Sequence, residues 1–504
     1  MSNALSQVVV LSDIHIGDTM PTTWYQPAVH DRYLEAICAW IIERADTVAE
    51  VVLLGDVVDF WTVPADRRPP TFAEILQANP QIFGPTGFFG RLLDAVAGRV
   101  TYLPGNHDMG ITAAEVSKIV SPAGHRMRYH PGPYHPAANA EVVLAHGNTS
   151  TMFNAPDPTS PWAGLPVGHF VTRMVASAWA RRLPPGKTVA DLPDQGAPDG
   201  LDYWSIAWGC FSRLDVSVTG ALLDSVATQT GTGPNDVFVM PDGSTTTLTQ
   251  VHALYDDLFT RWVAAEGGGE IGQLITWKAV LADARAYYMG WFAQRLAVQT
   301  GARVVGFGHT HAPVLGLDTR LVGYVNSGFG CPSLPDMPDN PITFATIDLT
   351  TAAATVWRCS SAGGPPQISP YAVPPASPVP VGMDDSCYVR LINHTGGPVT
   401  LVPDSARTDP GYWVARPPEV IPAGGAGSCW VQDFPGAEGS GARFTYAAAD
   451  GTRHDFSVAC PSLLFHWNSC HGGTSFRTRS GSDPWGPPGQ IAKSGHPFYV
   501  EFTL

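Results

Sequence analysis

Five short groups of histidine, aspartate and asparagine recur along the chain, and each follows a run of strand-forming residues. Short apolar runs of this kind are typical of buried strands. In open sheets, ligands bind beyond the carboxyl ends of the strands. We therefore expect all the groups to meet at one rim of a sheet. They are Asp13-Ile14-His15, Gly55-Asp56-Val57-Val58-Asp59, Gly105-Asn106-His107-Asp108, the single residue His146, and Gly308-His309-Thr310-His311.

The residue types in these groups suit the binding of two metal ions. Two ions about 3.5–4 Å apart need several nitrogen and oxygen ligands, and one ligand that touches both ions. A carboxylate can form this bridge because it has two oxygens and a negative charge, and neutral imidazole or amide groups complete each shell without adding charge. No cysteine lies in the groups, which argues against a structural zinc site. The candidate ligands are Asp13, His15, Asp56, Asn106, His146, His309 and His311.

The order of these groups resembles that of a known superfamily. The set DxH, GDxxD, GNHD, H and GHTH is similar to that of the calcineurin-like metallophosphoesterases, over roughly residues 7–358. The resemblance implies an α/β domain built as a four-layer α/β/β/α sandwich, here with a large helical insertion. It also implies two divalent ions, of manganese, iron or zinc. One ion would be held by Asp13, His15, Asp56 and His311, and the other by Asp56, Asn106, His146 and His309, with Asp56 as the bridge.

The same resemblance assigns roles to residues beside the ligands. His107 would be the acid that protonates the leaving oxygen, and Asp108 would orient it. Asp59 and Asn326 would support the ligands through hydrogen bonds. Two alternatives stand beside this interpretation. Any one group alone also fits a strand-end turn with a satisfied histidine, and the whole set also fits a catalytically inactive relative. The inactive relative is disfavoured because no ligand position is missing.

The residues after Asp59 bear on the substrate. Protein phosphatases of the superfamily continue the second motif as GDxxDRG, with an arginine that grips phosphate. Here the continuation is Asp59-Phe60-Trp61, and GDxxDFW resembles the branch that contains UDP-diacylglucosamine pyrophosphohydrolases and related phosphodiesterases. By analogy, this favours a phosphodiester or pyrophosphate substrate. If residues 383–504 bind lipid, a phospholipid or sphingophospholipid is the natural substrate. A phosphomonoesterase or protein phosphatase is the alternative.

Composition narrows the partners and the compartment. The chain has 504 residues, of which 44% are hydrophobic and 14% charged, and this length and composition suit two or more folded domains. Its formal net charge of −15 opposes non-specific binding to nucleic acid, so no nucleic-acid partner is expected. We see no signal peptide and no apolar stretch of about 18 residues, which predicts a cytoplasmic protein unless a non-classical route exports it. The eight cysteines are then expected to be reduced.

The chain between the motifs predicts a core domain followed by a linker. Apolar residues within residues 32–44 recur at helical spacing, which predicts a helix packed on the sheet. Strand-like segments after the last motif complete a domain of residues 1–359. The segment 360–382 is rich in proline, serine and alanine, which predicts an extended, semi-rigid linker.

A large insertion interrupts this domain. From about residue 150 to residue 300 the motifs stop, and two helical patterns follow. Both ends of the insertion lie next to predicted ligands, so we expect it to form a wall of the substrate site. Its aromatic residues, among them Trp204, Tyr288 and Trp291, fit either a plain core or the floor of an apolar pocket.

Residues 383–504 change in character. Short stretches of alternating apolar residues are separated by glycine, proline, asparagine and aspartate, which predicts a β-sandwich. The run Gly436–Tyr446, followed by Ala459-Cys460-Pro461, resembles a region of the aegerolysins, small β-sandwich proteins that bind membrane lipids. The resemblance implies peripheral contact with a lipid surface. The alternatives are an accessory domain without a ligand, a zinc site, and a membrane-binding or toxin-like protein whose first domain is only a scaffold. The zinc ligands would be Cys460, His466, Cys470 and His471.

Overall fold

The computed structural model divides the chain into two compact units. The first comprises residues 1–289, 306–315 and 325–374, and the second comprises residues 290–305, 316–324 and 375–504. The second unit therefore contains more than the expected tail, because it also includes the segment that precedes His309. The structure describes residues 5–136, 139, 141–192, 217–282, 288–317, 323–331, 341–361, 363–373, 384–434, 439–462, 467–481 and 483–504.

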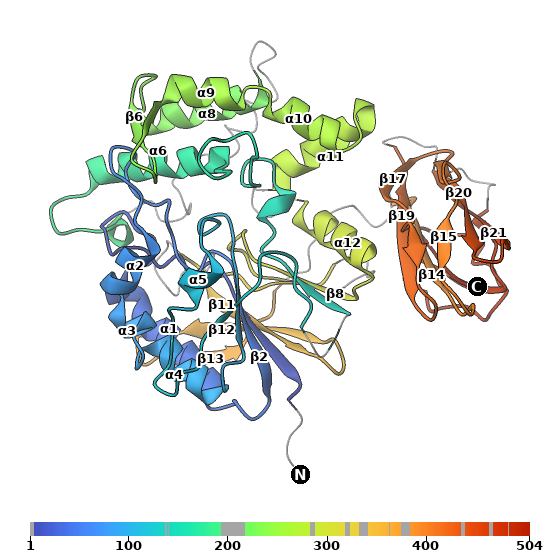
Figure 1. Ribbon diagram of the computed structural model, residues 1–504, viewed down its shortest axis with the longest axis horizontal. Coiled ribbons are helices and arrows are strands. Elements are labelled where there is room, and N and C mark those ends of the chain that lie inside the picture. The colour runs from blue at the N-terminus through green and yellow to red at the C-terminus, as the bar shows by residue number, and fades with distance from the viewer. Residues whose placement is uncertain are drawn as a thin grey trace. The chain divides into compact units, whose positions relative to one another are not determined.

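A seven-stranded sheet lies at the centre of the first unit (Figure 1). Four strands, β1 to β4, run parallel to their neighbours, and three antiparallel strands extend the sheet beyond β1. β1, β2 and β3 are almost continuous buried apolar runs, because a sheet covered on both faces needs apolar side chains on both. In order across the sheet they are β13 (Gln367–Pro370), β12 (Ala354–Ser360), β11 (Ile342–Asp348), β1 (Gln7–Leu11), β2 (Val48–Leu54), β3 (Val100–Leu103) and β4 (Arg128–Tyr129).

Short helices lie along one side of this sheet (Figure 1). The helix predicted within residues 32–44 is confirmed as α1 (Pro27–Ile42), which contacts β12 and β13. It begins earlier than expected because Pro27 occupies the first turn, where its missing N–H costs nothing. The other helices of this region are α2 (Phe72–Ala78), α3 (Pro80–Phe83), α4 (Phe88–Ala95) and α5 (Ala113–Val116).

A second sheet carries the remaining two groups of site residues. Its order is β5-β8-β10-β9. His146 follows β5 and His309 follows β8, and the backbone bond from Gly308 N–H to the His146 carbonyl (2.9 Å) joins the two strand ends. The strands are β5 (Val142–Leu144), β8 (Val304–Phe307), β10 (Gly323–Asn326) and β9 (Val314–Leu315).

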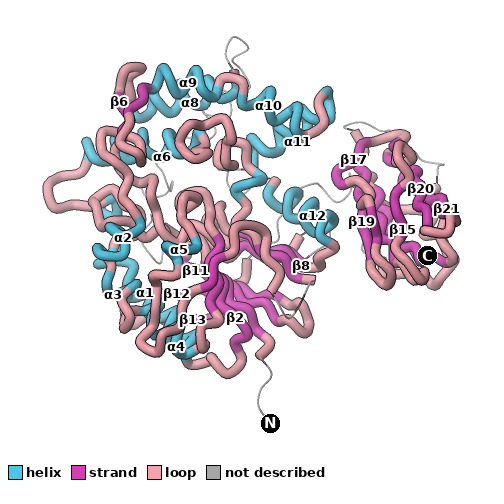
Figure 2. The backbone as a smooth tube through the Cα atoms, viewed as in Figure 1, coloured by secondary structure: helices cyan, strands magenta, loops and turns pink. Residues whose placement is uncertain are grey.

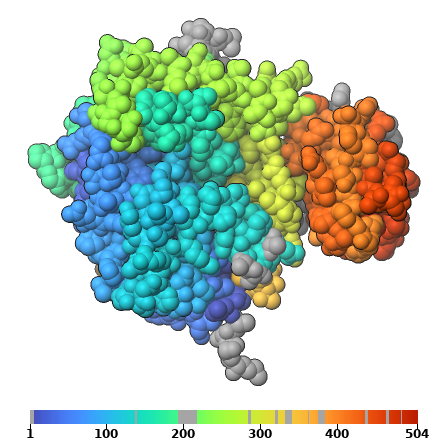
Figure 3. Space-filling view, in the orientation of Figure 1, coloured from blue at the N-terminus to red at the C-terminus, as the bar shows by residue number. Residues whose placement is uncertain are grey.

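The insertion is mainly helical, as its patterns predicted. Figure 3 shows it, in green, as a continuous layer along one side of the first unit. Trp204 lies outside the described residues. The elements are η1 (Asn148–Ser150), α6 (Val167–Arg182), η2 (Val189–Asp191), α8 (Val218–Thr230), β6 (Val237–Val239), β7 (Thr245–Thr247), α9 (Leu248–Tyr255), α10 (Leu258–Ala265) and α11 (Gly269–Ala282).

The mixed α/β architecture is confirmed, whereas the four-layer arrangement of the sandwich stays a prediction. The linker prediction needs one correction. Residues 367–370, placed in the linker by composition, form β13 at the edge of the large sheet. Proline is tolerated in an edge strand because one side of that strand needs no ladder hydrogen bond.

The second unit is rich in strands, and Figure 2 shows strands and loops but no helix among the described residues beyond 383. One sheet has the order β17-β19-β14-β24-β23, and the other has β18-β15-β20-β21-β22, with β16 paired to β20. The strands are β14 (Cys387–Ile392), β15 (Val399–Leu401), β16 (Arg407–Thr408), β17 (Tyr412–Ala415), β18 (Val420–Ile421), β19 (Ala426–Gln432), β20 (Ser440–Ala448), β21 (Arg453–Cys460), β22 (Ser469–His471), β23 (Ser475–Ser480) and β24 (Phe498–Thr503).

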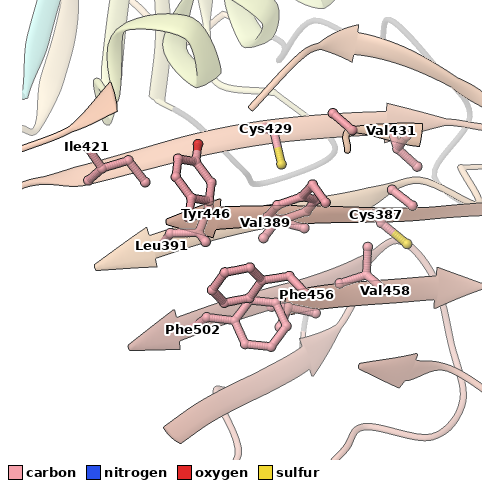
Figure 4. Packing of buried hydrophobic residues seen from close by; sticks show 14 of the residues in the cluster. Cys387, Val389, Leu391, Ile421, Cys429, Val431, Tyr446, Phe456, Val458 and Phe502 are labelled. Carbon is pink, nitrogen blue, oxygen red and sulfur yellow. The ribbon is translucent and has the colours of Figure 1, made fainter. Parts of the chain in front are cut away.

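The core of this unit is built from side chains of both sheets (Figure 4). Val389 and Phe502 from one sheet and Phe456 from the other are buried together. Helix α12 (Met289–Thr300) adds Trp291, whose indole N–H donates to Gln432 Oε1 at 3.1 Å. Trp291 is therefore buried in the second unit against Gln432 and Trp430 of β19, outside the apolar cluster between the two sheets.

The cysteines and the helices add two further observations. All seven cysteines in the described part of the chain are free thiols, and six of them are buried. No helix of the described residues has the length and apolar character needed to span a bilayer.

Candidate metal centre

The strand-end turns hold several predicted ligands in an uncommon backbone conformation. Non-glycine residues with positive φ are rare, cost about 1–3 kcal/mol each, and cluster at functional sites. The ligands' own carboxylates help to hold these turns, because Asp13 Oδ1 accepts the His309 N–H at 2.7 Å and Asp56 Oδ1 accepts the His107 N–H at 2.8 Å. The positive φ angles are those of Asp13 (59°), His15 (58°), Asp56 (51°), His309 (71°) and His311 (57°).

Two histidines of the first predicted ligand set turn nitrogen lone pairs toward each other. His15 Nδ1 is 2.9 Å from Asp59 Oδ2, and His311 Nδ1 donates to the Cys331 carbonyl at 2.7 Å. Carboxylate and carbonyl oxygens accept only, so each Nδ1 carries the proton and each Nε2 presents a lone pair. The two Nε2 atoms lie 3.1 Å apart, and His311 Nε2 is 4.0 Å from Asp13 Oδ1. Such a group of acceptors repels itself unless a cation joins it.

The second predicted set shows the same convergence of acceptors. His146 Nδ1 donates to the Leu54 carbonyl at 2.8 Å, which leaves a lone pair on Nε2. That Nε2 lies 3.1 Å from Asp56 Oδ2 and 3.2 Å from Asn106 Oδ1. His309 Nδ1 lies 3.0 Å from the same Asn106 oxygen. These four side chains therefore surround a second position that favours positive charge.

Asp56 connects the two sets. Its Oδ2 lies 3.1 Å from His146 Nε2 and 3.7 Å from His15 Nε2, so one carboxylate reaches both groups of acceptors. The donor atoms are nitrogen and oxygen without sulfur, and almost all are buried. This chemistry suits manganese, iron or zinc. The residues fit two divalent cations with Asp56 between them, and all seven predicted ligands lie in the first unit.

Charges within the site act on its titratable groups. Burial opposes ionisation of Asp56, but the neighbouring His146, His107 and His15 lower the pKa of Asp56 well below its usual range. Burial also opposes protonation of His146, yet the Asp56 carboxylate raises the pKa of His146 to about 9. Burial lowers the pKa of His311 to about 4. A cation at His146 Nε2 must therefore displace a proton, whereas His311 is already in its ligating form.

His107 lies beside the first set, and its ring stands edge-on to the His15 ring with centroids 4.5 Å apart. Its Nδ1 is 3.0 Å from Asp59 Oδ1, and its ring stacks on Trp61 with centroids 4.4 Å apart. Trp24 packs against the same ring at 5.2 Å. Burial opposes protonation of His107, but Asp59 and Asp56 raise its pKa above the ordinary value. His107 is thus a buried imidazole that its surroundings favour in the protonated form.

The predicted role of Asp108 is corrected by the structure. Asp59, rather than Asp108, is the carboxylate at the His107 ring nitrogen. Asp108 accepts the backbone N–H groups of Gly105 (2.5 Å), Asp56 (3.2 Å) and Val57 (2.9 Å). It therefore joins the loop after β2 to the loop after β3. Asp59 supports His15 and His107 together, which extends the role predicted for it.

The glycines of the motifs are required by close packing as well as by turn geometry. A Cβ atom on Gly55 would lie 2.4 Å from His146 Nδ1, and one on Gly105 would lie 2.3 Å from Asp56 Oδ1. Gly55 also has a φ of +84°, which side chains rarely adopt. Any larger residue at these positions would displace a predicted ligand.

Asn326 organises the turn that carries the last two histidines. Its Nδ2 donates to the Gly308 carbonyl at 2.7 Å and to Thr310 Oγ1 at 3.1 Å, while its Oδ1 accepts the Gly328 N–H at 3.1 Å. Asn326 is completely buried. These contacts fix the backbone of the turn that carries His309 and His311.

Sequence reasoning missed several contacts in the site. Ser12 donates a short hydrogen bond to Asp13 Oδ2, and its Oγ is 2.5 Å from Ser327 Oγ. Thr151 Oγ1 lies 3.3 Å from His309 Nε2. The two serines adjoin predicted site residues, so their position in the sequence was a usable signal. Thr151 has no such signal, because it lies at the start of the insertion.

Comparisons with known proteins give only remote likenesses. No protein-family model and no curated protein matches the chain. A dimetal phosphatase from Danio rerio is 14% identical, with 73% of this chain and 99% of that chain covered and a TM-score of 0.29. The lipid-binding protein Nakanori (15% identity, 23% and 69% covered, TM-score 0.19) and the protein RahU in complex with a TRIS molecule (13%, 23% and 92%, 0.18) are also similar. At these scores the likenesses support no conclusion about function, which depends on the geometry of the site.

Proposed function

We propose that the first unit is a phosphoesterase that uses two divalent cations. The observation that carries this proposal is the pair of acceptor groups that share Asp56. In one of them the Nε2 lone pairs of His15 and His311 lie 3.1 Å apart. In the other group, His146 Nε2 lies 3.1 Å from Asp56 Oδ2. Two adjacent cation positions with a common carboxylate suit in-line displacement at phosphorus.

The side chains divide the work of such a reaction. When bound, the two cations offset charge on the phosphate oxygens and lower the pKa of a water molecule. Asp59 holds the Nδ1 side of His107 and stabilises the protonated ring, which leaves Nε2 to deliver a proton to the leaving oxygen. Asn326 and Asp108 keep the ligand-bearing turns in place, because a ligand is effective only when its orientation is fixed.

A phosphodiester or pyrophosphate is the substrate class that we favour. Phe60 occupies the position where the GDxxDRG motif of protein phosphatases has its arginine. Trp61 follows it, and the Trp61 indole stacks on the His107 ring. A guanidinium would grip a phosphate dianion through two hydrogen bonds. Phe60 and Trp61 offer an apolar surface there, which suits an esterified group better than a free phosphate.

Hydrolysis of bis(p-nitrophenyl) phosphate tests this proposal. Protein stripped with a chelator should be inactive, and added Mn²⁺ should restore turnover in the wild type but not in Asp56→Asn. The matched control is Asp46→Asn, because Asp46 is exposed and precedes β2, at the strand end opposite Asp56. Absence of turnover in the metal-loaded wild type, on this diester and on pyrophosphate and monoester substrates, would favour a non-catalytic scaffold.

A second candidate function belongs to the second unit, and it is contact with a lipid surface. Two tryptophans of this unit are unusually exposed, Trp467 at 63% and Trp485 at 39%. Arg477 and Arg479 lie over the Trp485 ring, with guanidinium carbons 5.0 and 5.4 Å from its centroid. Tryptophan and arginine together suit the boundary between lipid headgroups and acyl chains.

Sedimentation with vesicles tests this second candidate. The full chain should sediment with vesicles of phosphatidylcholine and sphingomyelin, and the double variant Trp467→Ser, Trp485→Ser should lose that binding. Val420→Ser is the matched control, because Val420 is an exposed apolar residue of the same unit (51%). Equal sedimentation of all three proteins would contradict a lipid role for the tryptophans.

A further inference from the structure

An apolar cavity of about 400 Å³ lies next to the proposed catalytic site, within the first unit. Two short segments of its lining follow directly after site residues: Phe60-Trp61 after Asp59, and Met109-Gly110 after Asp108. The insertion contributes Trp162 and Leu165 to the same lining. A volume of this size is within the range of small-molecule sites. The insertion therefore contributes part of the lining of this cavity.

Trp61 links this cavity to the proposed acid. Its indole lines the cavity and also stacks on the His107 ring, with an interplanar angle of 29° and centroids 4.4 Å apart. Trp61 is 1% exposed, so its position is fixed by packing. A group in the cavity would consequently lie one aromatic ring away from the atom that protonates the leaving oxygen.

His169 gives the cavity one polar position. It lines the cavity, is 1% exposed, and packs edge-on against Trp61 at 5.4 Å. Neither of its ring nitrogens has a hydrogen-bond partner among the described residues. Burial, together with the positive charges of Arg173 and His107, lowers the pKa of His169 well below its ordinary value. The neutral ring therefore has one donor and one acceptor that no described residue engages.

The charged residues around the cavity are already engaged in local contacts. Arg68 pairs with Glu74 at 2.7 Å, Glu115 caps its own helix through the N–H of Thr112 at 2.9 Å, and Asp242 accepts from Ser244. Among the described residues of the lining, Arg68 is the one side chain that carries a fixed positive charge, and its charge is shared with Glu74. The lining therefore favours an uncharged occupant.

We propose that this cavity binds the apolar group of the substrate's leaving alcohol, an aromatic ring or short chain whose one polar substituent hydrogen-bonds His169. The inference rests on the proposed function, because it takes His107 as the acid on the leaving-group side. It adds a substrate class to that function: phosphate esters whose leaving alcohol is apolar over most of its surface. Trp61, Trp162 and Leu165 supply the contact surface.

Calorimetric binding of 2-naphthol to the full chain tests the cavity without requiring turnover. Gly110 lines the cavity, a Cβ atom there would meet nothing within 4 Å, and its φ is outside the left-handed region, so Gly110→Trp should fold and fill the space. We expect its Kd for 2-naphthol to rise about tenfold or more. Gly132→Trp is the matched control, because Gly132 is equally open and lies outside the cavity.

Leu165→Asn, a second cavity variant, should also weaken binding by placing a polar group in the wall. Thermal melting of each variant confirms that it is folded. The proposal is overturned if the wild type does not bind 2-naphthol, or if both cavity variants bind it as tightly as the wild type does.

Turnover then separates the cavity from the proposed function. Methyl 2-naphthyl phosphate and methyl phenyl phosphate have leaving groups of similar acidity but different size. The ratio of their kcat/KM values should fall about tenfold in Gly110→Trp, mainly through KM, and should not change in Gly132→Trp. An unchanged ratio would refute the leaving-group assignment. Naphthol binding without any ester hydrolysis would refute the proposed function and leave the cavity as a binding site.

His169→Phe tests the polar position. Phenylalanine keeps a flat ring but removes both nitrogens. The wild type should bind 2,6-dihydroxynaphthalene more tightly than 2-naphthol, by about threefold to tenfold for one added hydrogen bond. His169→Phe should lose that preference while still binding 2-naphthol. Equal affinities for the two alcohols in the wild type would show that His169 binds no substituent.

Discussion

At the scale of single residues, the proposed centre depends on which ring nitrogens carry protons. His311 and His146 each donate Nδ1–H to a backbone carbonyl, and His15 donates to the Asp59 carboxylate. These three bonds place the proton of each neutral ring on Nδ1, so that Nε2 is the ligating atom, in His146 once its second proton has been displaced. The groups that accept these Nδ1–H bonds therefore determine which nitrogen of each ring can bind a cation.

His107→Gln should lower turnover by roughly 10²–10⁴, the usual contribution of a general acid. Metal content should stay at the wild-type level because His107 belongs to neither proposed ligand set. The loss should be smaller for p-nitrophenyl esters than for alkyl esters, since p-nitrophenolate leaves without a proton. Steady-state kinetics on both ester types checks this, with His125→Gln as a control on a half-buried histidine elsewhere. Equal losses on both esters would mean that His107 positions the substrate only.

His169→Phe should stabilise the protein. Both ring nitrogens of His169 are buried without a partner in the described chain, and an unsatisfied buried polar group costs about 1–3 kcal/mol. The free energy of unfolding, measured with urea, should rise by about that amount in the ligand-free protein. A gain in stability with a loss of ligand binding would identify His169 as a residue kept for function. A variant less stable than the wild type would contradict this account.

At the scale of elements, Asp108 joins two strand-end loops. It accepts backbone N–H groups of Gly105, Asp56 and Val57. Asp108→Ala would leave three buried N–H groups unsatisfied, so we expect unfolding to become easier by roughly 3 kcal/mol or more. Asp348→Ala is the matched control, because Asp348 accepts the N–H groups of a partly exposed turn. Thermal or urea denaturation of both variants gives the comparison, and similar losses would argue against the loop-joining role.

The meeting of the residues that follow β1, β2 and β3 could be predicted, because neighbouring parallel strands end at the same edge of a sheet. β1, β2 and β3 are apolar runs that point the same way, so Asp13, Asp56 and Asn106, each following one of these strands, had to meet at one rim. The choice between Asp59 and Asp108 as the partner of His107 could not be predicted in this way. It depends on the dihedral angles of the loops, which the spacing of residues does not specify.

Composition led to a wrong assignment at one place, and the spacing of apolar residues was incomplete as a guide at another. Proline content hid β13, because an edge strand tolerates proline whereas the linker interpretation used composition alone. Trp291 has helical spacing with its neighbours in the sequence, but its hydrogen-bond partner Gln432 lies far along the chain. Periodicity identifies a buried face of a helix and does not identify what covers it. The cavity beside Trp61 could not be predicted for the same reason, because segments far apart in the sequence form its lining.

At the scale of the whole molecule, acidic residues outnumber basic residues. The chain carries a formal net charge of −15, and two divalent cations would offset part of it in the first unit. In the second unit, burial and then the nearby Asp385 and Asp384 carboxylates raise the pKa of Asp433 to about 6. A carboxyl group whose pKa is raised by folding destabilises the protein when it is ionised.

Asp433→Asn should therefore raise the Tm above pH 6, where the wild-type carboxylate is ionised in the folded state. The advantage should shrink as the pH falls through 6 and vanish below about pH 4, where Asp433 is protonated in both the folded and the unfolded chain. Calorimetric melting between pH 4 and pH 8 measures this difference. Asp483→Asn, at an exposed position of the same unit, should show no such dependence. A difference in Tm that does not change with pH would contradict the assignment.

The central claim is that two cations share Asp56, and metal content measures it most directly. Protein saturated with Mn²⁺ and freed of excess metal by gel filtration should contain two manganese ions per chain by elemental analysis. Asp46→Asn should also contain two, whereas Asp56→Asn should fall below one because both sets lose their common carboxylate. One ion or none in active wild-type protein, or two ions retained in Asp56→Asn, would contradict the account.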